Sequence, residues 1–290
     1  MTLKNLEESF NLLRKNPIIY LPDLFQALVS SILVYILYLY TGASSILPLM
    51  QSAETFSMDV LTKYLSENLI SIIISVIIFV VITFFLGVGI MILRFSLVKD
   101  LISNRKASLS NAWKNSGKLF LPVVFIRLLL FAINFIVFGI IILLSVLIYY
   151  LISLWNPTIA PYFAMGIGGI LVIAAFILLT LSFFFRYPIL FMKNVKNPVK
   201  VLQSSLKLFL DNYGFVIYTT LIILGINVIF SMILYYLNNL MGLGLSLVSQ
   251  GTLLIILGGI WSLIYLLFQL TITLWLTIFL FLKYTKSKIS

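Results

Sequence analysis

The positions of charged residues divide the chain into long apolar runs separated by short polar segments. No Asp, Glu, Lys or Arg occurs within residues 24–53, 68–93, 128–185 or 212–282. A membrane-spanning helix needs about 20 mostly apolar residues. The last two runs, of 58 and 71 residues, are therefore too long for one crossing, and each must contain a turn.

Turn-forming residues show where these two runs reverse. The segment "LWNPTIAPY" (154–162) has two prolines and an asparagine, and "NNLMGLGLSLVSQG" (238–251) is rich in Asn, Gly and Ser. In lipid, a lone segment must satisfy its own backbone hydrogen bonds, so the spans are predicted to be helices. The pattern predicts a single all-α membrane domain, residues 1–290, with six transmembrane helices at about 18–40, 67–97, 121–152, 162–190, 214–237 and 251–282.

Composition agrees with a bilayer as the main solvent of this chain. Hydrophobic residues make up 62%, charged residues only 9%, and the mean hydropathy is +1.18. Soluble domains are nearer half apolar and a quarter charged. The amphipathic start "MTLKNLEESFNLLRKNP" lacks the order of a cleavable signal peptide, so we expect it to be retained.

Lysine and arginine lie almost entirely on one side of the predicted bundle. Eighteen of the 19 fall in residues 1–23, 94–127, 186–211 and 283–290, and the other side has only Lys63. The positive-inside rule then predicts a multi-pass plasma-membrane protein with both termini in the cytoplasm. The net charge of +11 is explained by this topology, and we predict no nucleic-acid partner.

Three similar segments precede the odd-numbered spans. They read "LEESFNLLRKNPIIYLP" from Leu6, "LSNAWKNSGKLFLPVVF" from Leu109 and "LQSSLKLFLDNYGFVIY" from Leu202. Each has an apolar residue, then a small residue three positions later and a large apolar residue four positions later, as on one helix face. We predict three cytoplasmic amphipathic interface helices, the third beginning with Asn197 as N-cap and Pro198 at the first helical position.

The same spacing connects two mid-span asparagines. Asn134 lies 25 residues after Leu109, and Asn227 lies 25 residues after Leu202, in the similar contexts "AINFIVF" and "GINVIF". The offset predicts three parallel hairpin repeats, at about 3–98, 106–190 and 198–284, related by an axis along the membrane normal. The alternative is that amphipathic helices beside spans are common and look alike.

Asn134 and Asn227 are predicted to lie just beyond the middle of the hydrocarbon core, about 20 Å from the cytoplasmic ends of their spans. They either form a polar intramembrane pair at the bundle axis that contacts a solute, or make structural interhelical hydrogen bonds. The sequence leaves both interpretations open.

Four charged residues approach the membrane interior. Asp23 and Arg127 lie at matched depth in spans one and three, so they either form an intramembrane salt bridge or face interfacial water and phosphates separately. Arg94 and Arg186 mark the cytoplasmic ends of spans two and four. They are either phosphate-level anchors or join Arg127 in a basic vestibule for an anion or lipid headgroup.

Candidate chemistry is sparse. The chain has no Cys and no His, and of its eight acidic residues only Asp23 approaches the membrane interior. Thiolate metal sites, a histidine base and a nucleophile–base pair are therefore not predicted. We predict a protein that is not an enzyme and that has no cofactor.

The opening "ESFNLLRKNPIIYLP", with related segments before later spans, resembles a group of six-span bacterial and archaeal membrane proteins. That group is similar to the membrane domain fused to some glycerophosphodiester phosphodiesterases. The resemblance implies an integral membrane fold and supplies no active-site residues.

Two classes of function remain. The first is a non-enzymatic membrane organiser or accessory subunit that acts through helix packing and contact with anionic lipid headgroups, with a protein partner or a second copy of the chain. The second is a transporter or channel for a small or amphiphilic solute. A transporter needs polar groups that converge on a cavity, and the chain offers Asn134, Asn227, Gln269 and Thr273.

Overall fold

The computed structural model describes residues 2–41, 58–246 and 252–287. Within these ranges all regular structure is helical, and six helices are long and apolar enough to cross a membrane. The predicted all-α fold with six candidate spans is therefore confirmed. The candidate spans are Pro17–Tyr40, Thr62–Asn104, Ser116–Ser153, Ala160–Met192, Tyr213–Leu243 and Ile256–Lys286.

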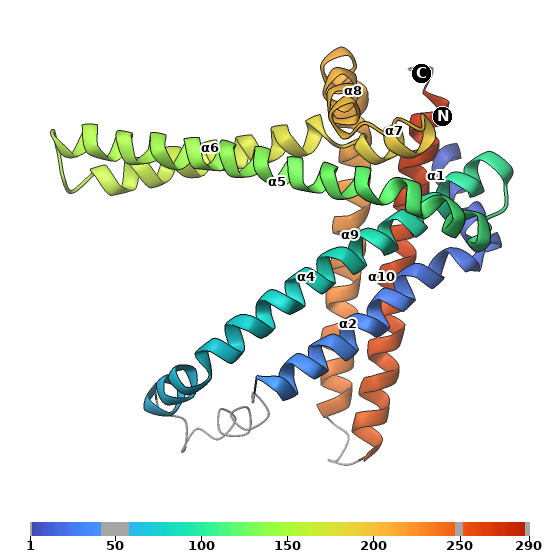
Figure 1. Ribbon diagram of the computed structural model, residues 1–290, viewed down its shortest axis with the longest axis horizontal. Helices are drawn as coiled ribbons and strands as arrows, with labels where there is room; N and C mark the ends of the chain where they lie inside the picture. Colours follow the sequence, from blue (N-terminus) through green and yellow to red (C-terminus); the bar gives the residue numbers. More distant parts are fainter. Residues whose placement is uncertain (1, 42–57, 247–251, 288–290) are drawn as a thin grey trace.

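The long helices form three hairpins that diverge from a common hub near both chain termini (Figure 1). Within each hairpin the two helices pack together, whereas their outer parts expose many large apolar side chains, as expected for surfaces that face lipid. The hairpins are α2 (Leu21–Tyr40) with α4 (Met58–Asn104), α5 (Leu109–Ser153) with α6 (Ala160–Ser182), and α9 (Tyr213–Ser246) with α10 (Thr252–Lys286).

The hub is a hydrophobic core built from the ends of several helices. It includes the last part of α4, the short helix α7 (Arg186–Met192) and the end of α10. Phe95 of α4 is at its centre, with ring centroids 5.1 Å from Tyr187, 5.4 Å from Phe191 and 5.4 Å from Phe281. This aromatic packing joins the three hairpins at one end only, so their other ends can diverge.

Two of the three predicted interface helices are separate elements. They are α1 (Thr2–Lys15), which is followed by the 3-10 turn η1 (Pro17–Tyr20), and α8 (Pro198–Asp211). Asn16 and Asn212 leave helical geometry at the ends of α1 and α8, with φ of −133° and −140°. The matching position of the middle segment is Leu119, buried in the hub, and α5 continues through it and through Pro122 without a break. The second interface segment is therefore helical as predicted, but it is the first part of α5 and not a separate helix.

The shared pattern of the three interface segments has a common structural result. The small residues Ser9, Ala112 and Ser205 are all buried, with 2% exposure or less. The large apolar residues that follow them, Phe10, Trp113 and Leu206, are exposed. Each segment thus turns its small residue toward the hub and its large residue outward, as an interface helix dipping into lipid would do. The threefold repeat itself stays a prediction.

Capping residues explain the helix boundaries that were predicted. The Asn197 side chain accepts hydrogen bonds from the backbone N–H groups of Val199 (3.0 Å) and Lys200 (3.2 Å), so the predicted N-cap of α8 is confirmed. Asn156 accepts from Thr158 (3.1 Å) and Ile159 (3.3 Å) in the turn between α5 and α6. The long apolar run 128–185 therefore reverses at the predicted place.

Two spans differ in detail from the sequence prediction. The fourth candidate span ends at Met192, close to the expected residue 190, but it is not one continuous helix: α6 ends at Ser182 and α7 begins at Arg186, because Pro188 fits the first turn of a new helix. α9 continues to Ser246, past its expected end at residue 237. The rest of the turn predicted over 238–251 lies outside the described residues.

Glu8 links α1 to α10 and to the loop that follows α4, and we expect it to contribute to stability. Its carboxylate pairs with Lys286 of α10 and with Arg105, whose Nη1 lies 2.6 Å from Oε1. The hydrogen bond from Lys286 is the main cause that lowers the pKa of Glu8 below its ordinary value of 4.5. A lowered carboxyl pKa stabilises the fold above the unfolded-state pKa, and this contribution is lost as the pH falls through the folded-state pKa.

Glu8→Gln is accordingly expected to destabilise the protein at pH 7 by about 1 kcal/mol, or about 2–4 °C in Tm. The measurement is thermal unfolding of the detergent-purified chain, with the exposed neighbour changed in Glu7→Gln as the control. The difference from wild type should vanish as the pH falls below 4.5. An equal loss in Glu7→Gln would show that the pairs of Glu8 contribute nothing specific.

Candidate anion-binding cavity

One face of α4 forms the floor of a cavity that contains two arginines. Its side chains recur at three- and four-residue spacing, as neighbours on one side of a helix do. α2 and α5 complete the walls, and the volume is about 490 Å³. We call this the arginine cavity, and its lining residues are Gln26, Phe79, Val80, Thr83, Phe84, Gly87, Met91, Arg94 and Arg127.

Arg94 is neutralised by Asp23. Nη1 of Arg94 lies 2.9 Å from Oδ1 of Asp23, and the side chains are 21% and 6% exposed. A buried ion pair of this kind is costly to break, because the remaining partner becomes an uncompensated charge. Asp23 in the first turn of α2 also complements the positive end of the helix dipole.

The partner predicted for Asp23 needs correction, because the structure pairs it with Arg94 and not with Arg127. Among the described residues, no salt bridge joins Asp23 to Arg127. The reason is helix packing: α2 lies along α4, its own hairpin partner, so the nearest guanidinium comes from α4. Equal depth in the membrane does not determine which helices are neighbours.

Arg127 is held in the cavity by apolar and soft groups. Its Nη2 lies 3.5 Å from the sulfur of Met91, and its guanidinium carbon lies 5.8 Å from the ring centroid of Phe84, a cation–π contact. A methyl group added at Gly87 would lie 3.6 Å from Nη1 of Arg127, an ordinary van der Waals contact, so Gly87 lies beside the guanidinium. Within the described part of the chain, no carboxylate pairs with Arg127.

The arginine cavity therefore has an excess positive charge. Asp23 neutralises Arg94 and leaves the charge of Arg127 uncompensated. The hydroxyl of Thr83 is also buried without a hydrogen-bond partner in the described part of the chain. A half-buried guanidinium and a free hydroxyl in one cavity are suited to a ligand that is anionic and accepts hydrogen bonds.

Arg186 does not line this cavity. Its Nη1 donates to the carbonyl oxygen of Phe183 (2.7 Å), the C-cap of α6, and its guanidinium lies 4.6 Å from the ring centroid of Tyr187. A cation at this place complements the negative end of the α6 dipole. Of the three arginines predicted to form a basic vestibule, Arg94 and Arg127 are brought together and Arg186 is not.

Asn134 and Asn227 are on different hairpins and are not brought together as a pair. α5 and α9 diverge from the hub (Figure 1), and neither amide hydrogen bonds to the other or to another described residue. Asn227 instead lines a separate cavity between α9 and α10. The interpretation of the two asparagines as a polar pair was wrong, because α5 and α9 do not pack along their middle parts.

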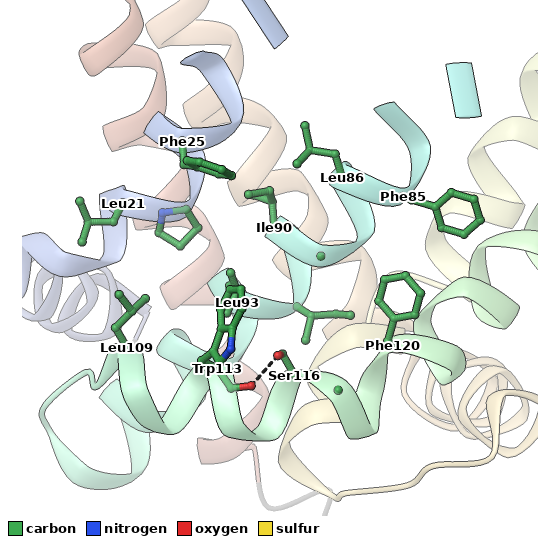
Figure 2. A pocket seen from close by; sticks show the side chains of 14 residues that line it. Leu21, Phe25, Phe85, Leu86, Ile90, Leu93, Leu109, Trp113, Ser116 and Phe120 are labelled. Atoms are coloured by element: carbon green, nitrogen blue, oxygen red, sulfur yellow. Dashed lines mark hydrogen bonds between the residues drawn. The ribbon is translucent and has the colours of Figure 1, made fainter. Parts of the chain in front are cut away.

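An apolar groove lies on the neighbouring face of α4 (Figure 2). Its volume is about 740 Å³, and α2, α4 and the first part of α5 form its walls. Phe25, Phe85, Trp113 and Phe120 face the groove. The hydroxyl of Ser116 donates a hydrogen bond to the carbonyl oxygen of Trp113 (2.6 Å), so its hydrogen is already used within the helix. The groove is therefore suited to hydrocarbon and offers almost nothing to a polar ligand.

Sequence reasoning missed how these features combine. Gly87 faces Arg127, whereas Gly89, two residues further along α4, faces the apolar groove. The signal available in the sequence was the alignment of Thr83, Gly87, Met91 and Arg94 on one helix face. It could not reveal Arg127 as the residue opposite.

Comparison with protein-family models, with curated proteins and with solved structures gives no match. The resemblance to the membrane domain of some glycerophosphodiester phosphodiesterases therefore stays a prediction, and function has to be argued from the cavities themselves.

Proposed function

We propose that this chain is a non-enzymatic membrane organiser that binds an anionic phospholipid where its first hairpin meets α5. The observation that carries the proposal is Arg127, a half-buried guanidinium without a carboxylate partner in the described part of the chain. An unpaired arginine at membrane depth is costly unless something polar or anionic reaches it. A lipid phosphate would supply that anion.

The adjoining apolar groove supports a lipid over a free anion. The same three helices form both the arginine cavity and the groove, on neighbouring faces of α4. The phosphate of one lipid would then occupy the arginine cavity, and its acyl chain would occupy the apolar groove. Most Lys and Arg residues lie on the side of the predicted bundle that carries both termini, which supports a cytoplasmic hub. The hub would then lie at the inner leaflet of the plasma membrane, where anionic headgroups concentrate.

The test is native mass spectrometry of the detergent-purified chain titrated with phosphatidylglycerol or phosphatidylcholine. We expect tighter binding of phosphatidylglycerol, and Arg127→Gln should weaken it about tenfold, since a hydrogen bond to a charged group contributes about 1.5–3 kcal/mol. Arg14→Gln, which removes an exposed arginine from α1, is the matched control. Equal losses in the two variants would overturn the proposal in favour of unspecific charge attraction.

A competition experiment distinguishes binding of a whole lipid from binding of a free phosphate anion. Glycerol 3-phosphate carries the anion without the acyl chains, so it should compete poorly with phosphatidylglycerol if the apolar groove is used. Competition at comparable concentrations would assign the site to a free anion.

Transport of an amphiphilic solute is the second candidate function. The observation that favours it is a mainly apolar groove of about 800 Å³ between α6 and α9, where the second and third hairpins diverge. Transport would be measured as movement of a fluorescent anionic lipid between the leaflets of liposomes that contain the purified chain.

A further inference from the structure

The third hairpin contains a polar cavity that is separate from the arginine cavity. It has a volume of about 350 Å³ and lies between α9 and α10. Most of its lining side chains are amides or hydroxyls, an unusual lining for a helix pair apolar enough to span a membrane. The chief polar residues are Asn227, Ser231 and Asn238 of α9, with Tyr265, Gln269 and Thr273 of α10.

Helical spacing brings these residues onto facing sides of the hairpin. On α10 the polar residues Tyr265, Gln269 and Thr273 recur every fourth position, and on α9 Ser231 follows Asn227 by four. The two polar faces meet in an otherwise apolar pair of helices. The lining is therefore a path of polar groups along the hairpin, with Phe230, Leu234 and Ile272 between them.

This path runs from the middle of the membrane to the surface opposite the termini. At 1.5 Å per residue, Asn227 lies about 21 Å along α9 from Tyr213 and Asn238 about 37 Å, whereas the hydrocarbon core is about 30 Å thick. The indole N–H of Trp261 donates to the Asn238 side-chain oxygen (3.0 Å) at the far end. A tryptophan bonded in this way is typical of the membrane–water interface.

Aromatic residues pack at the hub end of the cavity. Phe230 lines the cavity and meets Trp275 edge-on, with ring centroids 6.2 Å apart and an interplanar angle of 89°. Trp275 contacts Phe10 of α1 at 5.7 Å and donates its indole N–H to the carbonyl oxygen of Leu6 (2.9 Å). This cluster lies between the cavity and the hub, and Asn227, Ser231 and Tyr235 of the lining also face the groove between α6 and α9.

The side-chain amides of Asn227 and Gln269 need hydrogen-bond partners. Neither side chain hydrogen bonds to another residue in the part of the chain that the structure describes, and both are exposed. Leaving an amide unpaired in hydrocarbon costs about 4–8 kcal/mol on the water-to-cyclohexane scale. A polar partner must therefore reach these groups, and water or a polar ligand can supply it.

We propose that the third hairpin holds a hydrated cavity, open on the membrane side opposite the termini, that binds a small uncharged polar solute of the polyol class. The described lining has amide and hydroxyl groups and no carboxylate, lysine or arginine, so it has no charge with which to compensate an ion. Its volume is at the small end of ligand pockets. The site does not involve Arg127, so the lipid-binding proposal can fail or succeed independently.

Cysteine labelling tests this directly, because the native chain has no cysteine. Ser231→Cys and Gln269→Cys place thiols in the cavity, whereas Ile229→Cys and Leu267→Cys place thiols on exposed apolar positions at similar depth. Only an ionised, hydrated thiol reacts with a membrane-impermeant methanethiosulfonate. We expect the two cavity variants in proteoliposomes to react at least tenfold faster than the controls, from the side opposite the termini only.

Several results would overturn the proposal. Equally slow labelling of all four variants would show a dry cavity, and equally fast labelling would show that the hairpin is outside the lipid. Oxidative cross-linking of Ser231→Cys into a dimer, with slow labelling, would assign this face to contact between two copies of the chain.

The solute is tested in the same variants with glycerol as the probe. Glycerol should slow the labelling of Ser231→Cys, whereas sodium chloride of equal osmolarity should not. Fast labelling that glycerol does not slow would overturn solute binding.

Discussion

Asp23→Asn is expected to reduce the stability of the folded protein by about 3–5 kcal/mol, the usual cost of removing one partner of a buried ion pair. The change leaves the largely buried Arg94 guanidinium without its carboxylate, and Arg94 Nε already has no hydrogen-bond partner in the described part of the chain. The measurement is the yield of monodisperse protein and its Tm by size-exclusion chromatography after heating.

The identity of the partner can be tested with double substitutions. Asp23→Leu combined with Arg94→Met removes both charges, and should recover most of the stability lost in Asp23→Leu alone, because apolar replacement of a buried pair is often neutral. Asp23→Leu with Arg127→Met should recover none. Recovery by the Arg127 change and not by the Arg94 change would contradict the pairing in the structure.

Gly168→Val is expected to destabilise the α5–α6 hairpin by about 1–3 kcal/mol, the usual cost of overpacking. A methyl carbon at Gly168 would lie 2.5 Å from the hydroxyl oxygen of Ser145 and 3.3 Å from its β-carbon, so the Ser145 hydroxyl would have to rotate away and the larger valine would push the two helices apart. Glycine is thus required for close approach of α6 to α5. The expected result is a lower Tm and faster proteolysis in the turn around Asn156.

Controls for this prediction are available on both helices. Gly166 has open space beside it, so Gly166→Val should have little effect. Gly168→Ala should be tolerated better when Ser145→Gly removes the opposing side chain. If Gly166→Val and Gly168→Val behave alike, the effect is one of helix propensity and not of helix contact.

Much of the fold could be predicted because the bilayer imposes simple length and polarity rules. The charge-free runs located all six candidate spans, and Asn156 and Asn197 marked a turn and a cap through bonds to nearby backbone. The second interface segment does not end as a helix of its own. Leu119 stands where the other two segments have asparagine, and it packs into the hub, so α5 continues through it. Local signals of this kind work when the partner atoms are a few residues away.

The candidate sites were predicted less well because they depend on which helices are neighbours. Matched depth offered Arg127 as one possible partner of Asp23, yet α4 supplies Arg94. Asn134 and Asn227 were related by spacing, yet their helices diverge. The meeting of Asn227 with Gln269 and Thr273, or of Arg127 with Gly87 and Met91, is a contact between separate helices that periodicity cannot specify.

The sequence by itself determined that this is a six-helix membrane-type chain with amphipathic segments before its odd spans, because hydropathy and turn chemistry act locally. Only the tertiary structure decided that Arg127 lacks a carboxylate in the described part of the chain and that a polar cavity lies inside the third hairpin. The physical reason is that side-chain packing in the hub sets the directions of the three hairpins, and those directions determine which polar groups meet.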